Sequence, residues 1–99
     1  MINKMVTYKV KQESLDDAKM LVRELVENIK LNEEGTLLYR ALQQNDDPTR
    51  FIHFMSFEDE YSEEVHRKSN YCDEFNVSIL PMCDEEPSST ELNRLAFHD

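Results

Sequence analysis

The chain has 99 residues, of which 21 are acidic and 11 are basic, giving a formal net charge of -10 at pH 7. A chain of this length forms one domain and buries only a modest core, so we expect an oligomer or a covered sheet face. The negative charge and the scattered basic residues exclude nucleic acid and anionic membrane surfaces as natural partners.

No run of the sequence approaches the roughly 20 apolar residues that span a bilayer, so we expect a cytoplasmic protein with no membrane partner. Cys72 and Cys83 have neither the spacing nor the nearby histidine pair of a zinc site, and we expect no bound metal. Neither cysteine has an obvious basic neighbour that would lower its pKa. We interpret both as reduced thiols that pack in the core; a disulfide is the alternative and suits a cytosolic chain poorly.

The first two expected elements are a strand and a helix. Residues 5–11 alternate, with Val6, Tyr8 and Val10 on one side, which is typical of a half-buried strand. Apolar residues then recur at spacings of three and four, which predicts a helix of about five turns. These residues are Leu15, Ala18, Val22, Leu25 and Ile29.

A β-hairpin is expected next. Gly35, the only glycine in the chain, lies between the helix and a second strand at 36–42, and this position predicts a positive φ angle. Residues 45–49 have the composition of a turn, and the aromatic and branched residues of 51–57 predict a third strand.

The period changes again after Phe57, where acidic residues suit the start of a second helix. Tyr61, Val65 and Cys72 mark its expected buried stripe, and His66 lies at the edge of that stripe, where it can face a cavity. We expect this helix to be followed by a fourth strand at 76–82.

The final residues have a different composition. Residues 84–99 begin with an acidic, proline-containing stretch and then recover some apolar character. We therefore divide the chain into a domain at 1–83 and a C-terminal arm at 84–99 that contacts a partner subunit; a frayed tail is the alternative.

The element order βαββαβ predicts an α+β fold of the ferredoxin-like type with an antiparallel sheet. The second and third strands are apolar on both faces, and two helices can cover only one face of the sheet. We therefore expect a homodimer that packs through the sheet faces.

Residues 5–82 resemble the antibiotic biosynthesis monooxygenase domains, which are small dimeric ferredoxin-like proteins that form a dimeric α/β barrel. The resemblance rests on the order and spacing of three segments, which are residues 34–39, residues 47–51, and Phe57-Glu58-Asp59 together with His66-Arg67-Lys68-Ser69. It implies the fold more firmly than one reaction, because the family includes cofactor-free monooxygenases, haem-degrading enzymes and isomerases.

Two positions depart from the family pattern. Many members carry a glutamate where this chain has Met55, and a helix alanine corresponds to Ser62. The missing acid removes a group that could orient a catalytic histidine.

The resemblance implies that a haem-degrading member would have a tryptophan on the second helix and an iron-binding histidine about ten residues later. Here His66 and Asn76 occupy those positions, and the chain has no tryptophan. The comparison argues against haem degradation by that mechanism, while a haem contact through His66 or His53 stays open.

A cofactor-free oxygenase needs a dry cavity, a base that removes a substrate proton, and donors that orient the substrate. We assign the base to His66 and substrate contacts to Tyr8, Tyr39, Arg40 and His53. The alternatives are a structural histidine at position 66, core tyrosines with satisfied hydroxyl groups, and an interface role for His53.

The resulting hypothesis is a monooxygenase with no cofactor that acts on a small phenolic or quinol-like substrate. A protein of the same fold that binds a small hydrophobic molecule without turnover, as in a stress response, is an alternative. An isomerase and a dimer that serves only as an assembly module are the others.

Overall fold

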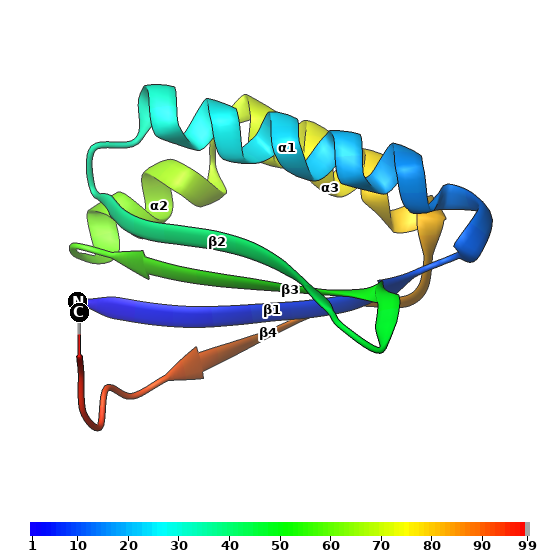
Figure 1. Ribbon diagram of the computed structural model, residues 1–99. Helices are drawn as coiled ribbons and strands as arrows, with labels where there is room; N and C mark the ends of the chain where they lie inside the picture. The colour runs from blue at the N-terminus through cyan, green and yellow to red at the C-terminus, as the bar shows by residue number, and fades with distance from the viewer. Residues whose placement is uncertain (99) are drawn as a thin grey trace.

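One antiparallel sheet forms a layer of the structure, and the helices form a second layer on one of its faces (Figure 1). The computed structural model describes residues 1–98. Its elements, in chain order, are β1 (Ile2–Val10), η1 (Gln12–Ser14), α1 (Leu15–Asn32), β2 (Thr36–Gln44), β3 (Asp47–Phe57), α2 (Glu60–Arg67), α3 (Asn70–Ile79), η2 (Leu80–Met82) and β4 (Cys83–Leu92), where η1 and η2 are 3₁₀ helices. The strands lie in the order β2-β3-β1-β4, which confirms the predicted ferredoxin-like α+β fold.

The core lies between β1, β3 and the helices. Tyr8 and Val10 of β1 are buried, as the alternation of that strand predicts. The predicted stripe of α1 is also confirmed, because Ala18, Val22, Leu25 and Ile29 are all buried. Phe51 of β3 and Phe75 and Ile79 of α3 complete the same cluster.

The single helix predicted after Phe57 is two helices, α2 and α3, because the helical backbone is interrupted at Lys68 and Ser69. Ser69 has an extended backbone and caps α3 by accepting a hydrogen bond from the Cys72 amide. Its hydroxyl also donates to the carbonyl of His66 at 2.7 Å, so one side chain joins the end of α2 to the start of α3. The predicted stripe is wrong on α2, where Tyr61 and Val65 are exposed and Ser62 and His66 are buried.

The fourth strand lies later than predicted. Residues 76–82 belong to α3 and η2, and β4 begins at Cys83 and pairs with β1. The stretch interpreted as the start of an arm is therefore largely an edge strand of the sheet. The domain boundary near residue 83 and the contact of residues 84–99 with a partner subunit stay predictions.

Gly35 has no positive φ angle, so that prediction is wrong. A Cβ atom at this position would lie 1.9 Å from Oγ of Ser62 and 2.5 Å from its Cβ. The glycine is therefore needed for the close approach of the α1–β2 connection to α2.

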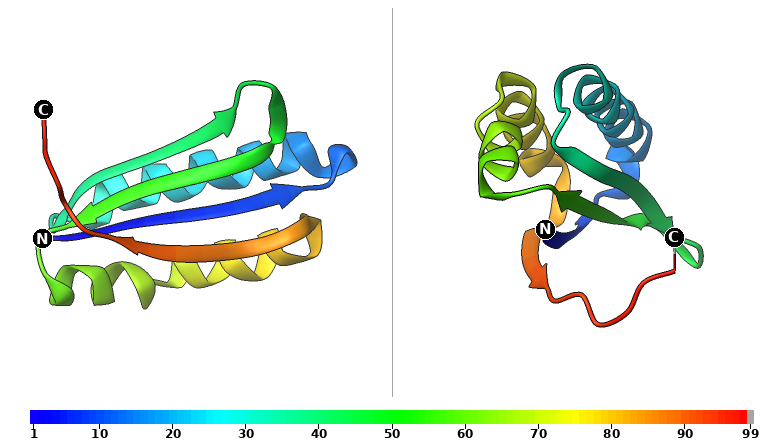
Figure 2. Two further views of the ribbon diagram at one scale, coloured as in Figure 1. Left: turned by 90° about the horizontal axis from the view of Figure 1, so that it is seen from below. Right: turned by 90° about the vertical axis from the view of Figure 1, so that its left-hand side faces the viewer.

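The helices all lie on one face of the sheet, so no helix of the described residues covers the other face (Figure 2). The strand register places an apolar group of side chains on that other face. We call this the open face; its apolar members are Met5, Leu38, Leu42, Ile52 and Phe54. The strand register pairs Met5 with Phe54 and Leu42 with Ile52, which gathers these side chains over three adjacent strands.

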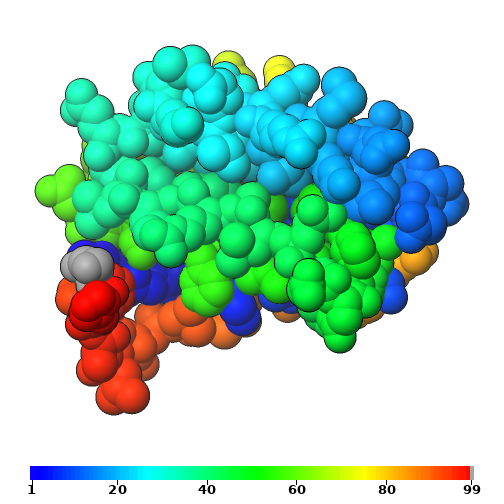
Figure 3. All heavy atoms as spheres, viewed as in Figure 1, coloured from blue at the N-terminus to red at the C-terminus, as the bar shows by residue number. Residues whose placement is uncertain are grey.

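Residues 93–98 leave the sheet and project from the body of the molecule (Figure 3). Leu95 is 99% exposed and Phe97 is 52% exposed within this tail. Among the described residues, no helix is long and apolar enough to cross a membrane.

Candidate functional site

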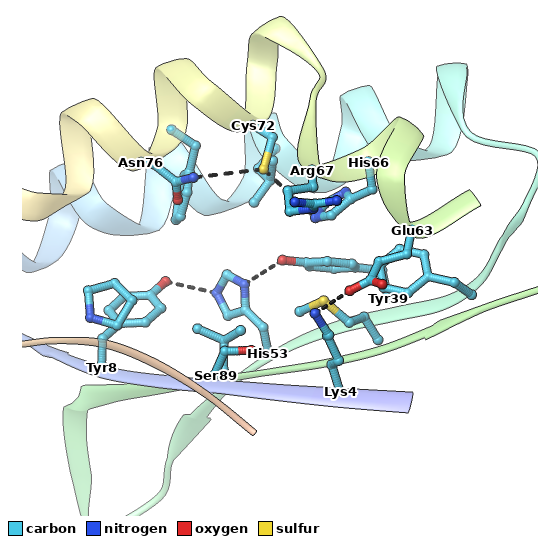
Figure 4. A pocket seen from close by; sticks show the side chains of 16 residues that line it. Lys4, Tyr8, Tyr39, His53, Glu63, His66, Arg67, Cys72, Asn76 and Ser89 are labelled. Atoms are coloured by element: carbon cyan, nitrogen blue, oxygen red, sulfur yellow. Dashed lines mark hydrogen bonds and ion pairs between the residues drawn. The ribbon is translucent and has the colours of Figure 1, made fainter. Parts of the chain in front are cut away.

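A cavity of about 260 Å³ lies between the helix-covered face of the sheet and helices α2 and α3 (Figure 4). Every strand contributes to its wall. Its apolar lining includes Val6, Leu25, Met55, Phe57 and Phe75, and its polar lining includes Tyr8, Tyr39, His53, His66, Cys72 and Asn76. The volume is slightly below the range of about 300–1,000 Å³ found for drug-sized ligands, so it suits one small molecule.

His53 of β3 joins two tyrosines that lie on the strands beside it. Its Nε2 lies 2.8 Å from the Tyr8 hydroxyl on β1, and its Nδ1 lies 2.7 Å from the Tyr39 hydroxyl on β2. Tyr8 and Tyr39 therefore lie on the two strands that flank the strand of His53. All three predicted residues line the cavity.

Burial keeps this hydrogen-bonded group uncharged. It lowers the pKa of His53 from its ordinary 6.5 to about 4, with a smaller contribution from His66. Burial is also the largest cause that raises the pKa of both tyrosines well above 10. A neutral imidazole has one donor and one acceptor nitrogen, so one tyrosine donates to His53 and the other accepts from it. The three groups thus form a directional chain.

His66 lies at the centre of the buried side of α2, with its ring between those of Tyr39 and Phe57. Its Nδ1 is 3.1 Å from both carboxylate oxygens of Glu33. A carboxylate only accepts hydrogen bonds, so Nδ1 carries a proton, and in the neutral form of the ring the lone pair lies on Nε2.

Glu33, which follows the last residue of α1, is almost fully buried and satisfied by three donors. Besides His66, it accepts from the hydroxyl of Thr36 at 2.6 Å and from the hydroxyl of Tyr71. Burial, followed by the hydrogen bond to Glu33, raises the pKa of Tyr71 to about 12, so this hydroxyl stays a donor at neutral pH. The carboxylate therefore fixes the orientation of His66 from outside the cavity.

Cys72 lies on the other side of His66, with Sγ 3.8 Å from Nε2. As the sequence indicated, no basic group lowers the pKa of this thiol, but the imidazole of His66, which the sequence did not place here, lies beside it. On one continuous helix, residues 66 and 72 would point in different directions, since six residues turn the chain through about 600°. The break at Ser69 brings the two side chains together.

A charged pair lies at another part of the wall. Lys4 of β1 and Glu63 of α2 form an ion pair whose side chains are 21% and 16% exposed. Arg67 lines the same region. Arg40, in contrast, is exposed on the opposite side of β2 from Tyr39 and does not line the cavity.

Comparison with known proteins decides the family. The model of the antibiotic biosynthesis monooxygenase family matches residues 1–77. The chain belongs to this family. No curated protein matches the chain in sequence.

Solved structures agree with the antibiotic biosynthesis monooxygenase fold over nearly the whole chain. One antibiotic biosynthesis monooxygenase has 20% identity and a TM-score of 0.89, covering 97% of this chain and 100% of its own. A conserved protein of Methanosarcina mazei has 24% identity and a TM-score of 0.86, covering 94% and 91%. A protein of Mycobacterium tuberculosis has 12% identity and a TM-score of 0.89, covering 99% and 98%. The TM-scores show that these proteins share the fold, and at such low identities they show nothing further. Membership of the family supports monooxygenase chemistry in general.

The family resemblance implied an acid at the position of Met55, and Met55 lines the cavity. In this chain the carboxylate that contacts His66 comes from Glu33. Sequence reasoning missed Glu33. The available signal was an acid at a helix C-terminus, where the helix dipole disfavours negative charge unless local donors compensate.

Metal binding has no obvious site here. Across residues 1–98, no group of three histidine, cysteine, aspartate or glutamate side chains could hold a metal ion. The absence of a cofactor stays a prediction.

The lowered pKa of His53 predicts a pH-dependent stability. Between pH 6.5 and pH 4 the unfolded chain takes up a proton at His53 that the folded chain does not, so the free energy of unfolding decreases as the pH falls. The full decrease is on the order of 3 kcal/mol. The glutamine amide in His53→Gln can donate and accept hydrogen bonds without titrating. This variant should therefore show a flatter curve of unfolding free energy against pH in this interval, as measured by urea unfolding at a series of pH values.

His98→Gln is the matched control, because His98 is an exposed histidine of the tail. Its curve should follow that of the unaltered protein. Parallel curves for His53→Gln and the unaltered protein would contradict the assignment.

Proposed function

We propose that this protein is a cofactor-independent monooxygenase that acts on a small phenolic or quinol-like molecule bound in the cavity. The observation that carries the proposal is the contact of His66 Nδ1 with Glu33, which leaves the lone pair on Nε2, the nitrogen that lies 3.8 Å from Sγ of Cys72 at the cavity wall. The family relationship supports monooxygenase chemistry in general, and the substrate class is our own inference.

His66 would act as the general base. Removal of a phenolic or enolic proton by Nε2 makes the substrate electron-rich, and Glu33 stabilises the imidazolium that forms. Monooxygenation then inserts one oxygen atom of O₂ into the substrate and releases the other as water. Without a cofactor, the substrate supplies all the electrons for this step.

The tyrosine chain would orient the substrate. One end of the Tyr8–His53–Tyr39 chain uses its hydroxyl proton within the chain, and the other end keeps a proton that can be donated to a substrate oxygen. The apolar remainder of the wall would lower the polarity around the reacting atoms.

Oxygen consumption tests the proposal. The purified, metal-stripped protein should show saturable uptake with at least one member of a panel of quinols, anthrones and readily oxidised phenols. His66→Ala should lower kcat by about 10²-fold or more, the typical contribution of a general base. His98→Ala should leave the rate unchanged, and circular dichroism checks that each variant folds.

Uptake no faster than the uncatalysed reaction across the panel, or an unchanged rate in His66→Ala, would contradict the proposal. Stoichiometric ligand binding without turnover would then favour the alternative of a protein that binds small hydrophobic molecules, which the apolar lining supports. Conversion of a substrate without oxygen uptake would favour an isomerase.

We also propose that a second copy of the chain covers the open face. Leu42 is 48% exposed and Phe54 is 38% exposed there, beside three further apolar side chains. An apolar group of this kind on a small domain is stabilised when a partner removes it from water.

Light scattering tests the dimer. The unaltered protein should have the mass of a dimer at micromolar concentrations, and Phe54→Asp should shift it to a monomer because it places a charge in the interface. Tyr61→Asp is the matched control, since Tyr61 is 74% exposed on α2, in the opposite layer. A monomer mass for the unaltered protein would contradict the proposal.

A further inference from the structure

Three side chains form a line from the interior to the cavity wall. Glu33 follows α1, His66 lies on α2, and Cys72 lies in the first turn of α3. Nδ1 of His66 is 3.1 Å from Glu33, and Nε2 of the same ring is 3.8 Å from Sγ of Cys72. His66 and Cys72 both line the cavity. An acid, an imidazole and a thiol in this order are the parts of an activated cysteine nucleophile.

The donors around Glu33 set the direction of proton movement. Because Thr36 and Tyr71 also donate to this carboxylate, it remains an acceptor for His66 Nδ1. Nε2 therefore points its lone pair at the Cys72 thiol and can accept its proton. Glu33 touches no reacting atom and acts as a positioning residue.

Cys72 rests as a neutral thiol. Burial, followed by the negative charges of Glu33 and Asp73, raises its pKa. A buried thiol of this kind is inert without a base, and here a base lies within reach of its proton. The amide of Asn76 also approaches the sulfur, at 4.0 Å.

Cys83 provides a comparison within the same chain. Its thiol is less buried than that of Cys72, and it donates to the carbonyl of Ile79 at 3.3 Å. Burial also raises its pKa, with contributions from Glu86 and Asp84. No histidine contact accompanies it among the described residues. If solvent exposure alone determined the reaction rate, Cys83 would react faster than Cys72.

We propose that Cys72 is a nucleophile that adds covalently to quinone-type electrophiles in the cavity, with His66 as its base. The choice of quinones rests on the proposed function, because oxidation of a phenol or quinol in this cavity yields such a product beside the thiol. The reactivity of the thiol itself depends only on the geometry of His66 and Cys72.

The addition is balanced without an external oxidant or reductant. The sulfur bonds to a ring carbon, and the electron pair of the carbon–carbon double bond moves to a carbonyl oxygen. The thiol proton passes through Nε2 of His66 to that oxygen. The hydrogen on the substituted carbon then moves to the second carbonyl oxygen, leaving a thioether-linked hydroquinone on Cys72.

Mass spectrometry with 1,4-benzoquinone under anaerobic conditions tests the proposal. Peptide mapping of samples quenched over time gives the rate at each cysteine. In the folded protein Cys72 should react faster than Cys83, and the two rates should become similar in concentrated urea. A faster reaction at Cys83 in the folded protein would overturn the proposal, and this comparison needs no variant.

His66→Gln should slow the reaction of Cys72 by about 10²-fold, as expected for loss of a general base, and leave that of Cys83 unchanged. His98→Gln should change neither rate. A folded His66→Gln protein with an unaltered Cys72 rate would also overturn the proposal.

This assay is independent of oxygenase turnover, because it contains no oxygen. Adduct formation without oxygen uptake on any phenol would keep the thiol site and reject the proposed function. Oxygen uptake without formation of a Cys72 adduct would support the proposed function and reject the thiol site.

Discussion

The buried carboxylate of Glu33 is the contact on which the site depends. It connects the end of α1 to Thr36 of β2, His66 of α2 and Tyr71 of α3. A buried carboxylate without partners costs several kcal/mol, so these elements must keep their relative positions for the charge to be tolerated. The same requirement holds His66 in one orientation. A single acid therefore links the packing of the helices to the chemistry available in the cavity.

The sequence predicted those parts of the fold whose side chains repeat with a clear period. The stripe of α1 and the alternation of β1 are examples, and the β2–β3 hairpin followed from its turn composition. The break at Ser69 was missed because apolar residues continue on both sides of it and the serine caps α3 only through its local geometry. The fourth strand was predicted too early in the chain because β4 is a polar edge strand, whose backbone pairing with β1 leaves no apolar alternation.

The sequence predicted several residues of the site but not the contacts between them. Tyr8, Tyr39, His53 and His66 line one cavity, whereas Arg40 could have been excluded, since adjacent strand residues face opposite sides of a sheet. The contacts of His66 with Glu33 and Cys72 could not be predicted, because they join three helices whose packing no local pattern describes. Gly35 illustrates the same limit. Its role comes from the approach of Ser62, which is distant in sequence, rather than from its own backbone angles.

The chemistry of the cavity requires that Glu33 hold the proton of His66 on Nδ1 and leave the lone pair on Nε2. Two-bond ¹H–¹⁵N correlation NMR of the histidine rings at neutral pH tests it directly, with His66→Gln to assign the signals. We expect a protonated Nδ1 and an unprotonated Nε2 for His66, with loss of this tautomer in Glu33→Ala. A protonated Nε2 in the unaltered protein would rule out His66 as the base, because neither a substrate proton nor the Cys72 proton could then be accepted.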